Sequence, residues 1–295
     1  MGEDFARTYS VARKTFQFAD RFLGFPLSQL IWQGPKEKLN DTVNTQPALL
    51  VHSVAALRIF QINYPEFKPA FVAGHSMGEI SALVASGALE FEDALHLVRR
   101  RGELMKIAGV ESPGGMAAIL GMSSELLEEI CQQSSDAEHL VQIANDNCPG
   151  QIVISGDQIA LEKAITLARE RGAKRAQRLS VSIAAHSHLM AASQDEFAKV
   201  VRQAPIKEPL IPILGNVTAL PLHSAVKIKA DLIDQLTSPV RWRESLLEMK
   251  RLGVENYIEI GNGNVLLGLA KRTHPDSTRI PFGNLEAIEK FLSLN

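Results

Sequence analysis

One short stretch, AFVAGHSMGEISALVASGA at residues 70–88, holds a serine between two glycines. Gly74, Ser76 and Gly78 fit G-x-S-x-G, the pattern of a nucleophile elbow. Such a serine sits on a tight turn from strand to helix, where flanking glycines avoid side-chain clashes and the hydroxyl is lifted clear of the sheet. The backbone N–H of Met77, at the start of the next helix, can then face a developing oxyanion.

The G-x-S-x-G pattern alone does not identify a nucleophile, because any glycine-rich loop can contain it. The predicted elements on either side are therefore needed. The apolar run at 71–73 predicts a strand, and the pattern over 79–86 predicts a helix. This strand-turn-helix context favours Ser76 as a nucleophile over Ser76 as part of a structural turn.

A serine hydroxyl needs a base at neutral pH, so the eight histidines are the next candidates. His186 and His188, in VSIAAHSHLM, follow a predicted strand, where the sites of α/β proteins gather. The residues alone leave these two nearly equal. His75 is next to Ser76, so its side chain is expected to diverge from the hydroxyl. The remaining histidines are more simply structural or loop residues: His52, His96, His139, His223 and His274.

Arg101 is an arginine on the apolar stripe of a predicted helix, whereas Arg99 and Arg100 point elsewhere. The stripe consists of Ala94, Leu97, Val98, Leu104 and Met105. An inward guanidinium needs a carboxylate partner, because an unpaired buried charge is costly. Two interpretations stay open: an internal ion pair, or a fork that binds a substrate carboxylate in a bidentate manner.

These residues must be positioned by elements that the periodicity predicts. Helical and strand patterns alternate over 45–105 and return after 210, which favours an α/β fold with a parallel sheet. The later elements are predicted as strands at 211–216 and 257–260 and helices at 243–252 and 264–272.

The middle of the chain has a different order. Strands are predicted at 114–122, 140–145, 151–156 and 174–182, and helices at 123–133 and 158–171, with a turn at 147–150. This β-α-β-β-α-β order is that of a ferredoxin-like module inserted into a larger domain. We therefore expect a large α/β domain from residues 1–112 and 184–295 and a small ferredoxin-like domain from 113–183.

Composition excludes several classes of protein. The 295-residue chain is 45% hydrophobic and carries a formal net charge of −2, which argues against nucleic acid or an anionic membrane as main partner. Cys131 and Cys148 form no disulfide framework, which fits a reducing compartment. No signal peptide, myristoylation pattern or membrane span is visible. A cytoplasmic, soluble protein is expected.

Other signals are weaker. Gly261-Asn262-Gly263 follows a predicted strand, but Leu266 stands where a dinucleotide loop needs its third glycine. No Cys/His cluster has the spacing of a metal site, so no metal is expected. The basic run at 169–178 is more simply a solvated face than a contact for an acidic partner.

Five motifs resemble those of the malonyl-CoA:acyl carrier protein transacylases and of polyketide synthase acyltransferase domains. They are GHSMGE (74–79), RGELM (101–105), NDNCPGQIVISG (145–156), SVSIAAHSHLM (180–190) and EIGNGNVLLGLAKR (259–272). They occur in order over nearly the whole chain. The resemblance implies an α/β-hydrolase-like large domain with a ferredoxin-like small domain, in agreement with the division above.

The resemblance also implies roles for individual residues. Ser76 matches the serine that is acylated, and His186, not His188, matches the catalytic histidine. Arg101 matches the arginine that pairs with the free carboxylate of malonyl. The family orients its histidine with a main-chain carbonyl, which Gln235 in DQLTSPVRW would supply.

Asn147 matches a family asparagine near the active-site entrance, and His75 is grouped with it as a substrate-binding residue. The implied reaction is ping-pong: Ser76 takes malonyl from malonyl-CoA, and the phosphopantetheine thiol of an acyl carrier protein then takes it from the serine. The implied protein is a monomer without a permanently bound cofactor. Ile183 to Ala185 lie where polyketide acyltransferases differ in extender unit, and they match neither usual pattern.

One departure keeps alternatives open. The family begins with a strand and a G-Q-G-S-Q motif, whose glutamine supplies a second oxyanion N–H. The sequence opens at MGEDFART, which resembles the segment after that motif. The alternatives are a thioester hydrolase or esterase on the same fold, and a catalytically impaired partner subunit without this oxyanion donor.

Overall fold

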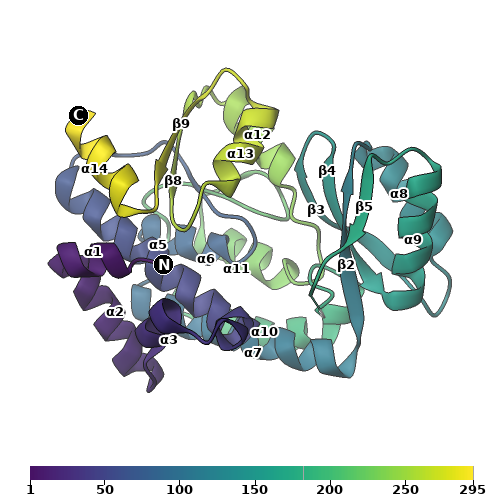
Figure 1. Cartoon of the computed structure of the whole chain (residues 1–295), viewed down its shortest axis with the longest axis horizontal. Coiled ribbons are helices and arrows are strands. Elements are labelled where there is room, and N and C mark those ends of the chain that lie inside the picture. The colour runs from purple at the N-terminus through teal and green to yellow at the C-terminus, as the bar shows by residue number, and fades with distance from the viewer. Residues whose placement is uncertain (182, 295) are drawn as a thin grey trace.

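The computed structural model describes residues 1–181 and 183–294 of the chain. Figure 1 shows a helix-rich body beside a layered unit of four strands and two helices. The elements of the first part are α1 (Glu3–Thr8), α2 (Ser10–Leu23), α3 (Leu27–Gln33), α4 (Lys36–Asn40), α5 (Thr42–Asn63), β1 (Val72–Ala73), α6 (Gly78–Ala85) and α7 (Phe91–Glu111).

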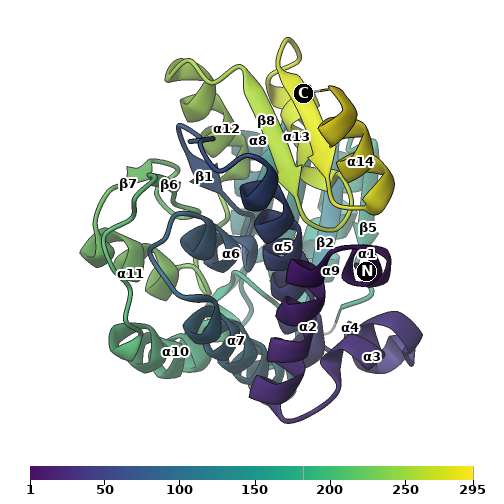
Figure 2. The ribbon, with the colours of Figure 1, turned by 90° about the vertical axis from the view of Figure 1, so that its left-hand side faces the viewer.

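Helix α5 runs through the middle of the helical body (Figure 2) and is buried along most of its length. Asp41 caps it by accepting a hydrogen bond from the N–H of Val43. Pro47 has no N–H for the carbonyl of Val43 one turn earlier. Arg99 of α7 donates to that carbonyl instead, over 3.2 Å. The α5–α7 contact thus satisfies a backbone group that the proline leaves open.

The same two helices approach closely at Gly102. A Cβ at Gly102 would lie 2.8 Å from the carbonyl oxygen of Thr42, so only glycine allows this spacing. The close approach brings Arg101, the neighbour of Gly102, within hydrogen-bonding distance of Gln46 on α5. Backbone proximity therefore places the inward arginine.

The strands of the helix-rich body form two separate small sheets, where the sequence predicted one parallel sheet. β1 pairs in parallel with β6 (Ile213–Leu214), but β6 pairs antiparallel with β7 (Pro221–Leu222). β8 (Asn256–Ile260) and β9 (Thr278–Phe282) form a separate parallel pair. The expected parallel pairing is therefore present in β1–β6 and β8–β9, but in the described residues the two pairs are not joined into one sheet, and β7 adds an antiparallel strand. Proline and glycine flank the short strands and stop the ladder from extending.

The second part of the chain contributes the remaining elements of this body. They are a 3₁₀ turn (His188–Met190), α10 (Ala191–Gln203), α11 (Ala225–Asp234), α12 (Trp242–Arg251), α13 (Val265–Thr273) and α14 (Leu285–Leu294). Helix α14 lies near α1 (Figure 1), and the N–H of Leu285 donates to Asp4.

The layered unit has the predicted β-α-β-β-α-β order: β2 (Gly114–Leu120), α8 (Ser124–Ser134), β3 (Val141–Cys148), β4 (Gln151–Asp157), α9 (Gln158–Glu170) and β5 (Arg175–Arg178). Its strands are antiparallel in the order β3-β4-β2-β5, with their own apolar core. β3 continues to Cys148, so the turn is shorter than predicted. β5 is shorter than the predicted 174–182 strand, and residue 182 lies outside the described residues.

β3 joins this unit to the rest of the chain. Val240, in the loop after α11, exchanges backbone hydrogen bonds with both Ala144 and Asp146. Asp146 also forms a 2.8 Å ion pair with Arg243 at the start of α12. The side chain of Asn147, the next residue of β3, is hydrogen-bonded to His75 on the turn that follows β1. Two segments far apart in sequence therefore meet beside Ser76.

Candidate active site

Ser76 occupies the turn between β1 and α6, as the sequence predicted. Its φ is 53°, the left-handed region that non-glycine residues rarely adopt. Buried Asn216 holds this conformation on both sides: its Oδ1 accepts from the N–H of Ser76 at 2.6 Å, and its Nδ2 donates to the carbonyl of Gly74 at 2.8 Å. The hydrogen bonds of one amide side chain thus support the strained turn.

The two glycines of the pattern have different reasons to be glycine. A Cβ at Gly74 would lie 1.9 Å from the carbonyl oxygen of Gly78, which no side chain can do. A Cβ at Gly78 would meet no heavy atom within 4 Å. The expectation that both glycines avoid a clash is therefore correct for Gly74 and wrong for Gly78.

His186 is the histidine that reaches the serine. Its Nε2 lies 2.8 Å from the Oγ of Ser76, and its Nδ1 lies 2.7 Å from the backbone carbonyl of Gln235. A carbonyl only accepts, so Nδ1 carries the proton and Nε2 is free to accept one from the serine. Burial, helped by the charge of Arg101, lowers the pKa of His186 to about 3. The imidazole is therefore neutral at neutral pH.

His188 contacts an aspartate and not the serine. Its Nε2 lies 2.9 Å from Oδ2 of Asp157, the last residue of β4. Asp157 also accepts from the N–H of Leu140, so His188 ties the loop that carries His186 to the layered unit. The structure separates two histidines that the residues alone left nearly equal.

Arg101 is 2% exposed and points at the serine. Its Nη2 donates to Ser76 Oγ at 3.0 Å and to Gln235 Oε1 at 2.9 Å, and its Nη1 donates to Gln46 Oε1 at 3.0 Å. Nη1 also lies 3.3 Å from the sulfur of Met105. All four partners are uncharged. Among the described residues, the buried Nε of Arg101 has no hydrogen-bond partner.

The charge of Arg101 is therefore not neutralised by an adjacent carboxylate. No ion pair to Arg101 occurs among the described residues, which counts against the internal ion-pair interpretation. Burial lowers the pKa of Arg101 to about 10. The arginine remains a cation at neutral pH with a free donor.

His75 and Asn147 bind each other. His75 Nε2 donates to Asn147 Oδ1 over 2.8 Å, because the amide oxygen can only accept. His75 also packs against Trp242, with ring centroids 5.6 Å apart, and its side chain diverges from the serine hydroxyl as expected. Burial lowers the pKa of His75, so the pair is neutral. This contact joins β3 to the nucleophile turn.

The backbone N–H of Met77 has no acceptor among the described residues. Met77 precedes α6 and is half-buried, so its N–H is one of the unpaired donors at a helix N-terminus. Such an N–H can bind a developing negative charge beside Ser76.

Sequence reasoning missed three polar residues around Ser76. Asn216 is the last residue of the strand predicted at 211–216, and residues at strand ends in α/β folds are candidates for a site, so a signal existed. Gln46 and Glu79 lay inside predicted helices without any distinguishing spacing. The side chain of Gln235 was also missed: it bonds Arg101, and its Nε2 donates to Glu79 and to the Ser76 carbonyl.

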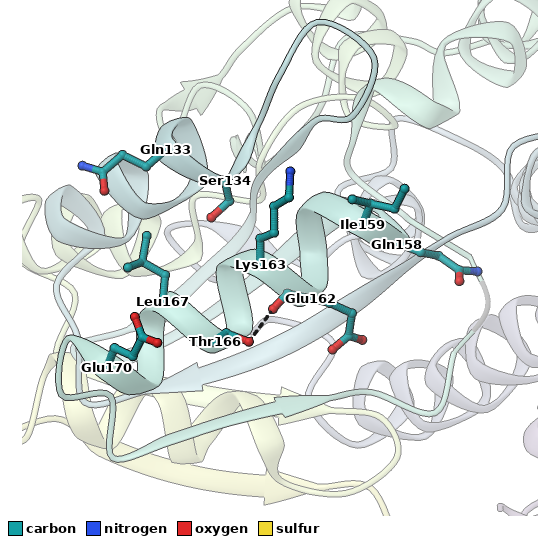
Figure 3. Close-up of a pocket in the computed structure, with 9 residues that line it drawn as sticks. All are labelled: Gln133, Ser134, Gln158, Ile159, Glu162, Lys163, Thr166, Leu167 and Glu170. Carbon is teal, nitrogen blue, oxygen red and sulfur yellow. Dashed lines mark hydrogen bonds between the residues drawn. The ribbon is translucent and has the colours of Figure 1, made fainter.

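Other features do not belong to this site. A surface hollow of about 790 Å³ lies between α8 and α9 (Figure 3), lined by side chains such as Gln133 and Lys163 and by none that surround Ser76. In the described part of the chain, no group of three His, Cys, Asp or Glu side chains could hold a metal ion. Over the same residues, no helix is long and apolar enough to cross a membrane.

Comparison with known proteins gives consistent matches. Residues 1–281 match the family described as "Acyl transferase domain". The chain is 44% identical over 289 residues to the malonyl CoA-acyl carrier protein transacylase of Bacillus subtilis, covering 98% of this chain and 90% of that protein. It is 42% identical over 292 residues to the enzyme of the same name from Haemophilus influenzae, covering 98% and 93%.

Solved structures match equally well. The crystal structure of an acyl carrier protein S-malonyltransferase from Vibrio cholerae superposes with a TM-score of 0.95 at 41% identity, covering 99% of this chain and 94% of that one. A malonyl-transacylase in complex with its type II polyketide synthase acyl-carrier protein has a TM-score of 0.95 at 38% identity, covering 100% and 95%.

Proposed function

This chain belongs to the acyl transferase domain family, and we propose that it moves a malonyl group from malonyl-CoA to the phosphopantetheine thiol of an acyl carrier protein. The observation that carries this proposal is the buried cation of Arg101, which lies beside a serine nucleophile with neutral partners only. An acyl group that ends in a carboxylate supplies the missing negative charge. The names of the relatives agree with this substrate.

Ser76 and His186 carry the first half-reaction. As Oγ attacks the thioester carbon, Nε2 of His186 takes the hydroxyl proton, and the Gln235 carbonyl stabilises the protonated ring through Nδ1–H. The backbone N–H of Met77 donates a hydrogen bond to the tetrahedral oxyanion. Collapse breaks the carbon–sulfur bond, and the proton on His186 passes to the leaving thiolate of coenzyme A.

The second half-reaction runs in reverse with a different thiol. His186 takes the proton of the phosphopantetheine thiol, the thiolate attacks the malonyl ester, and Ser76 leaves and recovers the proton. The thioester and the carried phosphopantetheine supply all the chemistry, so no permanently bound cofactor is part of this proposal.

Arg101 distinguishes this substrate from a plain acyl group. Its free Nε–H, together with the Nη2–H that would turn from Ser76 Oγ to the substrate, can hold the malonyl carboxylate in a bidentate manner while the thioester lies at Ser76. His75, on the nucleophile turn, and Asn147, on β3, would line the same space. Whether the enzyme accepts other carboxylated extender units depends on the region of Ile183 to Ala185.

We also propose an assignment of the chain to two domains. Residues 113–183 form a ferredoxin-like small domain, supported by the strand order β3-β4-β2-β5. Residues 1–112 and 184–295 form an α/β-hydrolase-like large domain, supported by the strand-turn-helix geometry at Ser76. The protein would act as a monomer in the cytoplasm, where the free, buried Cys131 and Cys148 stay reduced.

Intact-mass measurement after incubation with malonyl-CoA tests the function. We expect a malonyl adduct on the protein that disappears when a carrier protein bearing phosphopantetheine is added, with malonyl appearing on the carrier. Release of free malonate without an adduct would point to a hydrolase. Neither adduct nor malonate would mean an impaired partner subunit.

A further inference from the structure

Glu79 is a buried acidic residue to which the proposed chemistry gives no role. It lies on the first turn of α6, three residues after Ser76, and is 0% exposed. Its carboxyl group contacts that of Asp231, a buried residue of α11. Arg101 of α7 is close enough to Glu79 for the two groups to interact electrostatically. Two carboxyl groups therefore meet in the interior beneath the nucleophile.

The hydrogen bonds of this pair are unequal. Asp231 accepts three: from the N–H groups of Val217 and Thr218, at 3.1 Å each, and from the Thr218 hydroxyl at 3.0 Å. Glu79 accepts one side-chain hydrogen bond, from Gln235 Nε2 to its Oε2 at 2.5 Å, and the backbone N–H of Asn216 also faces its carboxyl group. Its buried Oε1 has no donor in the described structure. Two carboxyl groups in contact need a proton between them, and the oxygen without a donor is the one that can carry it.

We propose that Glu79 is a positioning residue that works as a neutral carboxylic acid, donating its proton to Asp231 and accepting from the side chain of Gln235. Burial supports this, because it raises the pKa of Glu79 well above its usual value, and the charge of Asp231 adds to the effect. The amide of Gln235 and the N–H of Asn216 act in the opposite direction.

The neutral acid orients Gln235. With Nε2 of Gln235 bound to Glu79 and to the Ser76 carbonyl, its Oε1 must face Arg101. The same residue positions His186 through its backbone carbonyl. Glu79 thus acts on both the base and the arginine through one neighbour.

Neutrality also matters for Arg101. An ionised Glu79 would be a resident anion near the guanidinium and would compete with a substrate carboxylate. A proton on Glu79 leaves the charge of Arg101 available. This consequence rests on the proposed function, whereas the protonation of Glu79 does not.

Two variants separate the neutral acid from an ionised one. Glu79→Gln keeps the shape, since its amide can donate to Asp231 and accept from Gln235, but it cannot ionise. Glu79→Ala removes both hydrogen bonds. We expect Glu79→Ala to lower malonyl transfer by about tenfold or more, as expected when buried polar groups lose their partners, and Glu79→Gln to recover transfer to within about threefold of the parent.

Infrared difference spectroscopy supplies a readout that needs no activity and no Glu79→Ala protein. At neutral pH the parent should show the carbonyl band of a protonated, D₂O-sensitive carboxylic acid, which Glu79→Gln lacks. The exposed Glu92→Gln is the matched control and should keep the band. Absence of the band in the parent, or a Glu79→Gln enzyme as impaired as Glu79→Ala, would overturn the proposal. Failure of the proposed function would instead appear as a missing malonyl adduct with the band present.

Discussion

Nη2 of Arg101 lies 3.0 Å from Oγ of Ser76, so the buried cation and the nucleophile are in direct contact. In a malonyl thioester, one methylene separates the reacting carbonyl carbon from the carboxylate. An acyl group bonded to Oγ can therefore reach the guanidinium without any movement of α7. Under the proposed function, we therefore expect this relationship to favour short acyl groups with a terminal carboxylate.

Replacement of the nucleophile is the first test. Ser76→Ala should abolish the malonyl adduct, because among the described residues no other hydroxyl is hydrogen-bonded to His186 Nε2. Intact mass measures the adduct, and circular dichroism confirms that the variant is folded. A persistent adduct on folded Ser76→Ala would contradict the assignment of the nucleophile.

Replacement of Arg101 tests selectivity. Arg101→Ala should weaken malonyl transfer by about 2–4 kcal/mol of transition-state binding, the typical effect of removing one partner of a buried charge pair. Acetyl transfer should fall little or rise, since acetyl has no carboxylate. The measurement is kcat/KM for both thioesters with the same carrier protein. Equal losses for the two would indicate a structural role.

The two neighbouring histidines form a matched pair. His186→Ala should slow acylation by about 10²–10⁴-fold, the usual contribution of a general base. His188→Ala should be mild, because it loses only the contact with Asp157. Single-turnover acylation by malonyl-CoA measures both. The reverse order would show that the wrong histidine has been assigned.

The two glycines of the elbow form a second pair. Gly74→Ala should prevent folding or remove activity, because its Cβ would lie 1.9 Å from the Gly78 carbonyl oxygen. Gly78→Ala should keep both, since its Cβ meets nothing within 4 Å. Thermal unfolding and acylation rate are the readouts. Equal sensitivity at both positions would mean that Gly78 serves a contact made only with substrate.

Acid should destabilise the fold through His186. Its pKa is about 3 in the folded protein and near 6.5 when unfolded, so below pH 6.5 the unfolded state binds the proton first. The free energy of unfolding should therefore fall as pH drops from 6.5 toward 3, by up to about 1.4 kcal/mol per pH unit from this group. Urea unfolding of the parent and of His186→Ala between pH 7 and 4.5 measures the difference. Parallel curves would show that His186 is not held neutral by burial.

The sequence by itself determined the features that depend on local pattern. The glycine spacing around Ser76 and the strand and helix signals on either side predicted the elbow. The helical spacing of apolar residues around Arg101 predicted that this side chain faces inward. Strand and helix patterns that follow one another predicted the β-α-β-β-α-β order of 114–178. Each of these follows from residues that are close in sequence, because side-chain direction repeats with the period of the helix or strand.

Tertiary structure alone decided which groups meet. His186 is 110 residues from Ser76 and Asn216 is 140 residues away, and no local pattern states that they share a site. Periodicity showed that Arg101 is buried but not that its partners are amides, since burial and partner identity are separate properties. The extent of the large sheet also escaped prediction, because a strand's length depends on the neighbour with which it pairs. Contacts across long loops are fixed by packing of the whole chain, and only the folded structure contains them.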